Sequence, residues 1–135
     1  MSRIILREFH PDQDTGLILS TFAKSVYHGG YLVPVGHKRD WFESFHQYAM
    51  ALLEDAELYI ACSEYDLNHI VGYSIVDGGR LEFVYVKEGY RNQGIGTLLT
   101  QDKYQRINAN NLTNAGAAIL KSHRYEEDEH GEEND

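Results

Sequence analysis

The part of the sequence best suited to chemistry runs from Val84 to Leu99, where a predicted strand gives way to a predicted helix. It holds one arginine, Arg91, and two glycines, Gly94 and Gly96, at the start of that helix. Glycine lets the backbone approach a ligand closely, and the first amides of a helix have no partner within it. Such amides bind phosphate groups, helped by the positive end of the helix dipole. The spacing therefore predicts a pyrophosphate site with Arg91 as a mobile cation beside it.

Two other phosphate-binding loops fit these residues less well. A P-loop needs a lysine before its hydroxyl residue, whereas the sequence here reads Ile95-Gly96-Thr97. A dinucleotide-binding loop needs a third glycine at the position of Leu99, and a parallel βαβ unit that the flanking pattern does not provide. A glycine pair taken alone more often marks an ordinary turn between a strand and a helix.

A longer pattern over these residues resembles the acetyl-CoA motif of the GNAT superfamily of N-acetyltransferases. Val86 ends a strand, a Tyr-Arg pair follows four and five residues later, and a Gly-Ile-Gly run begins at Gly94. Residues 4–14 are similar to the first strand and helix entry of that family, and residues 70–73 to its third strand. The resemblance extends from residue 3 to about residue 108.

The resemblance implies an N-acetyltransferase that uses acetyl-CoA as co-substrate and a primary amine, on a small molecule or a peptide, as acceptor. In that family the pantetheine lies along the fourth strand like an added strand, and a main-chain amide polarises the acetyl carbonyl. That amide would belong to Tyr85 or Val86 here. The residues expected to bind the co-substrate are Val84, Tyr85, Val86, Arg91, Asn92, Gln93, Gly94, Ile95, Gly96 and Thr97.

The general base and the acceptor pocket are less sharply marked. Glu82 lies on the same strand, near a glutamate that several family members keep; the alternatives are a solvated residue or a pair with Arg80. Tyr104 and the histidines are further candidates for the base. In relatives the loop between the first two helices forms the acceptor pocket, and the aromatic residues here could instead belong to the core. That region offers Tyr27, His28, Tyr31, Leu32 and Trp41, of which Tyr31 and Trp41 are the candidates for the pocket.

Other features bear on metals and location. The seven histidines show no His-x-x-x-His or His-Glu-x-x-His spacing, so the sequence predicts no metal site. The single cysteine, Cys62, excludes an internal disulfide and fits a reducing compartment. The early charges argue against a signal peptide, and no apolar run approaches the roughly 20 residues of a membrane helix. We therefore expect a cytoplasmic protein.

The elements that position the motif follow from hydrophobic periodicity. Alternation predicts four strands, at residues 4–9, 57–64, 69–76 and 81–87. The last three are consecutive and antiparallel, with a hairpin at Asp77-Gly78-Gly79, and so form a meander. The helix of the motif is expected to run to about Asn108. The order is then β-α-α-β-β-β-α, an α+β domain.

Two helices are predicted between the first and second strands. We expect Asp12 or Asp14 to cap the first helix, a loop to follow from about Tyr27 to Arg39, and Asp40 to cap the second helix. The second helix carries one apolar stripe, which consists of Trp41, Phe45, Tyr48 and Leu52.

The resemblance implies the GNAT fold, a mixed, mostly antiparallel central sheet flanked by helices. Residues 108–114 contain no β-branched run of strand length, so we expect the family's fifth strand to be reduced to two or three residues or missing. With Tyr125 as the closing aromatic, Leu120 stands where the family often has a tyrosine that protonates the departing thiolate. These departures favour, as the alternative, a catalytically weak or inactive GNAT-fold protein that binds acyl-CoA in an interaction or regulatory role.

The formal net charge is −9, but it is unevenly distributed. Residues 126–135 hold seven acidic residues and no lysine or arginine, which leaves 14 acids and 12 bases in residues 1–125. We expect an acetyltransferase-like domain over 1–125 and a disordered acidic tail over 126–135, which solubilises the protein or attracts a basic partner. This balance argues against nucleic acid as a partner, and no membrane partner is expected. A dimer is compatible with the sequence.

Overall fold

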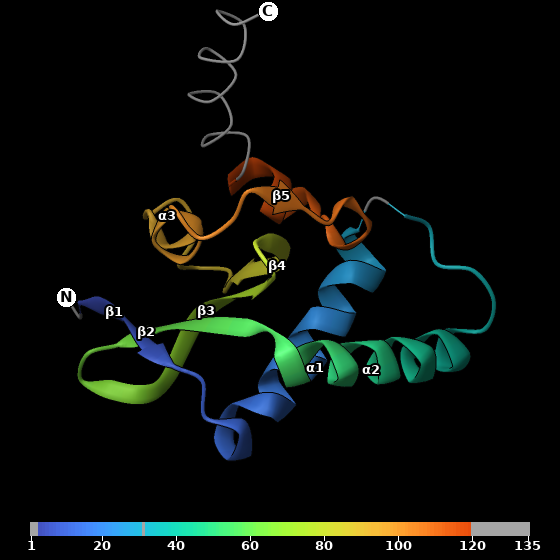
Figure 1. Cartoon of the computed structure of the whole chain (residues 1–135), viewed down its shortest axis with the longest axis horizontal. Coiled ribbons are helices and arrows are strands. Elements are labelled where there is room, and N and C mark those ends of the chain that lie inside the picture. The colour runs from blue at the N-terminus through green and yellow to red at the C-terminus, as the bar shows by residue number, and fades with distance from the viewer. Residues whose placement is uncertain (1–2, 31, 120–135) are drawn as a thin grey trace, which may run out of the picture.

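The computed structural model describes residues 3–30 and 32–119 (Figure 1). The elements in chain order are β1 (Ile4–Glu8), α1 (Pro11–Gly29), α2 (Lys38–Asp55), β2 (Glu57–Ser63), β3 (Asp66–Asp77), β4 (Arg80–Val86), α3 (Ile95–Thr100), β5 (Arg106–Ile107) and the 3-10 turn η1 (Ala109–Asn111). Residues 114–119 are helical again.

One sheet holds all five strands, in the order β1-β2-β3-β4-β5. The pairs from β1 to β4 are antiparallel, and β2, β3 and β4 form the predicted meander. Strand β5 lies parallel to β4. The prediction of a mixed, mostly antiparallel central sheet is therefore confirmed.

Helices cover both faces of this sheet (Figure 1). On one face α1 and α2 pack against an apolar cluster that includes Phe22, Tyr73 and Phe83. On the other face α3 packs against a second cluster, which includes Val84 and Leu99. Strand β4 contributes to both clusters because successive side chains of a strand point to opposite faces.

The first two helices begin earlier than predicted, with His10 and His37 as N-cap residues that make no side-chain cap. Asp40 lies in the first turn of α2 and is not its cap. Helix α1 has a proline at its first position, where a missing N–H costs no hydrogen bond. Helix α1 also continues to Gly29, and so includes the first three residues of the predicted loop.

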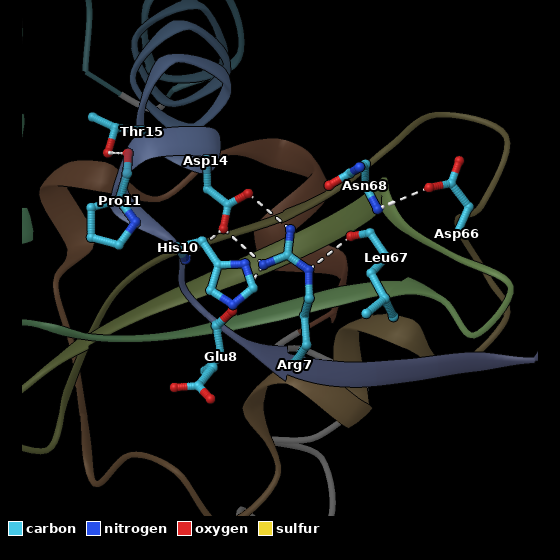
Figure 2. Close-up of polar contacts among 9 residues, drawn as sticks. All are labelled: Arg7, Glu8, His10, Pro11, Asp14, Thr15, Asp66, Leu67 and Asn68. Atoms are coloured by element: carbon cyan, nitrogen blue, oxygen red, sulfur yellow. Dashed lines mark hydrogen bonds and ion pairs between the residues drawn. The ribbon is translucent and has the colours of Figure 1, made fainter.

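Asp14 is buried and does not cap α1. Its carboxylate accepts two N–H groups of Arg7, both at 2.8 Å, and the backbone N–H of His10 at 2.7 Å (Figure 2). The Arg7 Nε donates to the Leu67 carbonyl at 2.8 Å. This ion pair therefore ties β1 to the start of α1 and to the beginning of β3.

The segment after the motif differs most from prediction. Helix α3 ends at Thr100 after six residues, well short of Asn108. The chain leaves the helical conformation at Gln101, whose ψ is 125°, and Asp102 then has a left-handed φ of 62°. The N–H groups of Gln105 and Arg106 then donate to the Gly79 carbonyl at 2.7 and 3.2 Å. These bonds draw the chain alongside β4 as the two-residue β5, so the expected fifth strand is present but reduced.

The sheet opens beyond this short pairing. Strand β5 pairs with β4 only through Arg80 and Leu81. The next residue, Glu82, has no partner on β3 because the register shifts there, which marks a β-bulge. Within residues 3–30 and 32–119, no strand pairs with the outer edge of β4 past Leu81. A cleft can therefore form along the remainder of β4.

Candidate functional site

Two cavities lie along this open part of β4. The first, here called the β4 cavity, has a volume of about 280 Å³ and opens between the last turn of α1, β4 and residues 113–119. Its lining consists of Ser25, His28, Gly29, Phe83, Val84, Tyr85, Val86, Arg91, Thr113, Asn114, Ala115 and Ile119. An antiparallel bridge between Gly30 and Thr113 lies beside the α1 end of this cavity.

The second, here called the loop cavity, has a volume of about 420 Å³ and lies at the start of α3. Its lining consists of Val86, Tyr90, Arg91, Asn92, Gly94, Ile95, Gly96, Thr97, Ala115, Ala118 and Ile119. The two cavities share Val86, Arg91, Ala115 and Ile119. The two cavities therefore adjoin, and together, here called the cleft, they extend from the motif loop along β4 to the end of α1.

The backbone of β4 presents hydrogen-bonding groups to this cleft. The Lys87 N–H donates to the Val71 carbonyl on β3 at 2.8 Å. Backbone groups alternate in direction along an antiparallel pair, so those of Tyr85 point toward β3 and those of Val84 and Val86 point away from it. Of the two amides expected to face a ligand, only that of Val86 is on the open edge.

Arg91 lies where the two cavities meet. Its Nε donates to the Val86 carbonyl at 2.9 Å, and the residue is exposed. That bond fixes the guanidinium beside the open edge of β4 while its two Nη groups can still reach into the cleft. A guanidinium presents several donors in a planar fork, which suits phosphate oxygens.

The motif loop supplies further donors. The first hydrogen bond within α3 runs from the Leu98 N–H to the Gly94 carbonyl at 3.0 Å. The N–H groups of Ile95, Gly96 and Thr97 therefore have no partner within the helix. Because α3 has only six residues, these local amides, rather than the dipole of a long helix, would hold an anion.

The two motif glycines are required for different reasons. Gly94 has a φ of 82°, and a Cβ added there would meet no atom within 4 Å, so its space is open toward the loop cavity. A Cβ on Gly96 would lie 2.7 Å from the Ile119 side chain. At Gly96 the missing side chain therefore admits a residue of this chain and lets residues 114–119 pack on α3.

Strand β3 holds α3 and the loop in place. The Ser74 Oγ donates to the Leu99 carbonyl at 2.7 Å, and the Tyr90 hydroxyl lies 3.2 Å from His69 Nε2. Gly72 allows α3 to approach closely, because a Cβ there would lie 2.6 Å from the Tyr85 carbonyl oxygen and 3.1 Å from Leu99.

Glu82 is buried, and its carboxylate is fully engaged outside the β4 cavity. One oxygen accepts from Arg80 Nε, which realises the predicted alternative of an Arg80 pair. The other accepts from Asn108 Nδ2 at 2.8 Å and lies 3.5 Å from the Tyr48 hydroxyl. Burial raises the pKa of Tyr48, whose hydroxyl also accepts from Asn111 Nδ2 at 2.8 Å. These contacts link β4 to α2 and to the residue just after β5, at the point where β4 and β5 separate.

Of the other expected site residues, Gln93, Trp41 and Tyr104 line neither cavity of the cleft. Trp41 stacks on Phe45 at 4.9 Å and contacts Tyr27 at 5.0 Å, and it lines neither cavity. Tyr104 packs against the apolar cluster beneath α3. Tyr31 lies outside the described residues, as do Leu120, Tyr125 and the acidic stretch 126–135.

Sequence reasoning missed Ser25 and named His28 only as one of the loop residues and one of the histidines; both line the β4 cavity from the C-terminal end of α1. Residues three apart share one face of a helix. The signal that could have found them is this spacing immediately before Gly29-Gly30, where the helix ends against β4.

The described residues contain neither a cluster of metal ligands nor a membrane-spanning helix. Among residues 3–30 and 32–119, no group of three or more His, Cys, Asp or Glu side chains could hold a metal ion. Over the same residues, no helix is both long enough and apolar enough to cross a membrane.

A protein-family model matches the larger part of this chain. Residues 35–128 match the family model of the acetyltransferase (GNAT) domain. No curated protein sequence is significantly similar to this chain.

Solved structures show the same fold at low sequence identity. A protein from Pyrococcus furiosus assigned as an acetyl transferase is 13% identical, with a TM-score of 0.65 and coverage of 90% of this chain and 91% of that one. A Clostridium acetobutylicum protein assigned as an acetyltransferase, solved with acetyl-CoA, is 14% identical, with a TM-score of 0.58 and coverage of 90% and 88%. Apo YjaB from Escherichia coli is 16% identical, with a TM-score of 0.52; the match covers 72% of this chain but only 61% of YjaB.

Proposed function

The chain belongs to the GNAT acetyltransferase family, and from that premise we propose that it transfers an acetyl group from acetyl-CoA to a primary amine. The observation that carries the proposal is the pair of adjoining cavities along β4. One end of the cleft has an arginine and helix-start amides suited to phosphate, its middle has strand amides with no strand partner among the described residues, and its far end is lined by α1. The order of these groups along the cleft matches the order of the pyrophosphate, the pantetheine arm and the thioester in an acyl-CoA.

Each part of the cleft has a separate role in this proposal. The amides of Ile95, Gly96 and Thr97 and the Arg91 guanidinium would hold the pyrophosphate, while Val84 and Val86 would bond the pantetheine amides as an added strand. Bound there, acetyl-CoA supplies an activated acyl group whose thiol is a good leaving group.

The Val86 N–H would then polarise the acyl carbonyl. A fixed donor aimed at developing negative charge contributes about 2.7–4 kcal/mol to lowering a barrier in other enzymes. The small size of β5 supports the same arrangement, because its early end leaves this amide without a strand partner.

Binding is tested first. Acetyl-CoA at about millimolar concentration should raise the melting temperature of the wild-type protein by several degrees through mass action. Gly94→Glu should abolish that shift, since it places a carboxylate in the loop cavity. Gly36→Glu is the matched control, because Gly36 has a similar φ of 84° and equally open space around its missing Cβ but lines neither cavity. A wild-type protein that shows no shift would overturn acetyl-CoA binding.

Catalysis is tested by release of the CoA thiol from acetyl-CoA. The acceptor panel is benzylamine, tyramine, glucosamine, spermidine and a lysine-containing peptide, with acetylated products identified by mass spectrometry. Thiol release that depends on one of these amines supports the proposal. A melting shift without thiol release on any acceptor would instead support the alternative of an acyl-CoA-binding regulatory or interaction protein.

A cytoplasmic setting is part of the proposal. The single cysteine, Cys62, is buried and free, which fits a reducing compartment. The proposal includes neither nucleic acid nor membrane as a partner.

A further inference from the structure

His28 is placed by the fold at the acyl end of the cleft. The loop cavity reaches only Val86 of β4, whereas the β4 cavity continues past it to Phe83 and to the last turn of α1. A ligand that places its phosphates beside Arg91 and runs along β4 therefore directs its other end toward Ser25 and His28. This placement rests on the proposed function.

The chemistry of the β4 cavity singles out one side chain. Its described lining holds no aspartate or glutamate, and its titratable groups are Arg91, Tyr85 and His28. An arginine stays protonated and a tyrosine hydroxyl holds its proton until about pH 10, so neither takes a proton near neutral pH. Histidine is the side chain that gains and loses a proton between about pH 5 and 8. Glu82, the base expected from the sequence, lies outside this lining.

The surroundings of His28 suit proton transfer. The ring packs edge-on against Tyr27, with centroids 5.0 Å apart, which restricts its orientation. The residue is exposed, so a proton taken from the acceptor can pass on to solvent. Ser25 lies one turn earlier on the same face, where its hydroxyl can accept an N–H of the amine. Lys24, also one turn earlier, is the nearest charged residue along α1.

We propose that His28 is the general base of the reaction. An acceptor arrives as an ammonium ion with no free lone pair. One of its protons passes to a ring nitrogen of His28, and the freed lone pair forms a C–N bond to the thioester carbonyl carbon while the C–S bond breaks. The second proton goes to the departing sulfur and the imidazolium releases the first to solvent. One ammonium ion and one thioester thus give one amide, one thiol and one proton.

The test compares kcat/KM over about pH 5.5–8.5 for wild type, His28→Gln, Glu82→Gln and His46→Gln, with the panel amine that wild type acetylates fastest. His46 is the matched control, since it is an exposed histidine on α2 that lines neither cavity of the cleft. His28→Gln should lower kcat/KM about 100-fold or more and remove the inflection near neutral pH. It should keep the acetyl-CoA melting shift, and added imidazole should restore part of the rate.

The outcomes separate this inference from the proposed function. Wild-type turnover together with a His28→Gln variant of unchanged rate and pH profile overturns the role of His28 and leaves acetyl transfer standing. A pH inflection lost in Glu82→Gln but kept in His28→Gln assigns the base to Glu82 and also overturns it. A wild-type protein that releases no thiol with any amine overturns the proposed function, and this inference with it.

Discussion

At the residue scale, the ion pair between Arg7 and Asp14 is both buried and held by two hydrogen bonds of 2.8 Å. Their side chains are only 7% and 2% exposed, and the arginine meets both carboxylate oxygens. Burying such a pair removes two charges from water, so its presence adds little net stability. Breaking it is costly, because the remaining charge is then buried alone. The pair matters for what it positions, since it fixes the end of α1 opposite to His28.

Asp14→Asn should lower the free energy of unfolding by about 3 kcal/mol, because it leaves the Arg7 guanidinium buried without a counter-charge. Denaturant unfolding measures this loss. Asp12→Asn is the control, since Asp12 lies in the same first turn but is exposed. Equal losses in the two variants would contradict the assignment of the effect to the ion pair.

The same pair predicts a pH dependence. The hydrogen bond from Arg7 lowers the pKa of Asp14 below its ordinary value. The folded state therefore binds the proton more weakly than the unfolded chain, and the stabilisation is full above about pH 4 and is lost as the pH falls through the lowered pKa. Acid titrations of wild type and Asp14→Asn should converge at low pH. Parallel curves would contradict this.

Arg91 is the residue on which affinity for the phosphates should depend. Arg91→Ala should weaken acetyl-CoA binding about 10-fold, because charge-assisted hydrogen bonds contribute about 1.5–3 kcal/mol each. Isothermal titration calorimetry measures the change. Arg39→Ala is the control, since Arg39 is an exposed arginine on α2 that lines neither cavity of the cleft. An unchanged affinity in Arg91→Ala would contradict the phosphate role.

At the element scale, the contrast between the meander and α3 shows what the sequence can predict. Residues 57–87 alternate regularly and include a strong hairpin turn, so β2, β3 and β4 were predicted nearly as they occur. The end of α3 depends on bonds from residues 105–106 to the Gly79 carbonyl, a contact between segments distant in sequence. Local periodicity carries no information about such a bond, and the helix was therefore predicted too long.

Gly72→Ala should destabilise the protein and displace α3, because the new Cβ would collide with the Tyr85 carbonyl and crowd Leu99. The melting temperature and the acetyl-CoA shift should both fall. Gly16→Ala provides the opposite control: it lies in α1 with nothing within 4 Å of a new Cβ. It should stabilise the protein by about 0.5–1 kcal/mol through helix propensity. A harmless Gly72→Ala would refute the close approach.

At the scale of the whole molecule, the sequence predicted the chemistry of the cleft better than its shape. The Gly-Ile-Gly run and Arg91 were identified from type and spacing, and they do line one cavity. The contribution of α1 was predicted only in part. His28 was named among the loop residues and the histidines, whereas Ser25 was missed because it joins the cleft only through the packing of α1 across β4. Glu82 shows the reverse case. Its place on β4 made Glu82 a candidate for the general base. The β-bulge and the hydrogen bond from Asn108 keep its carboxylate outside the β4 cavity.

The acidic stretch over residues 126–135 leads to a prediction about the whole molecule. Its deletion removes seven carboxylates and should leave kcat/KM within about twofold if the stretch only solubilises the protein. Thiol release at low and high salt measures this. A loss confined to cationic acceptors at low salt would show that the stretch attracts them over a distance.

The open edge of β4 has a consequence for the protein in the absence of ligand. The side chains of Val84 and Val86 are buried, but their backbone groups on the open edge can pair with an extended segment of another chain, and such pairing favours aggregation. Arg91 protects the edge only in part, through the Val86 carbonyl. An acyl-CoA bound as an added strand would occupy the same groups. We therefore expect the protein to aggregate more readily in the absence of acyl-CoA than in its presence.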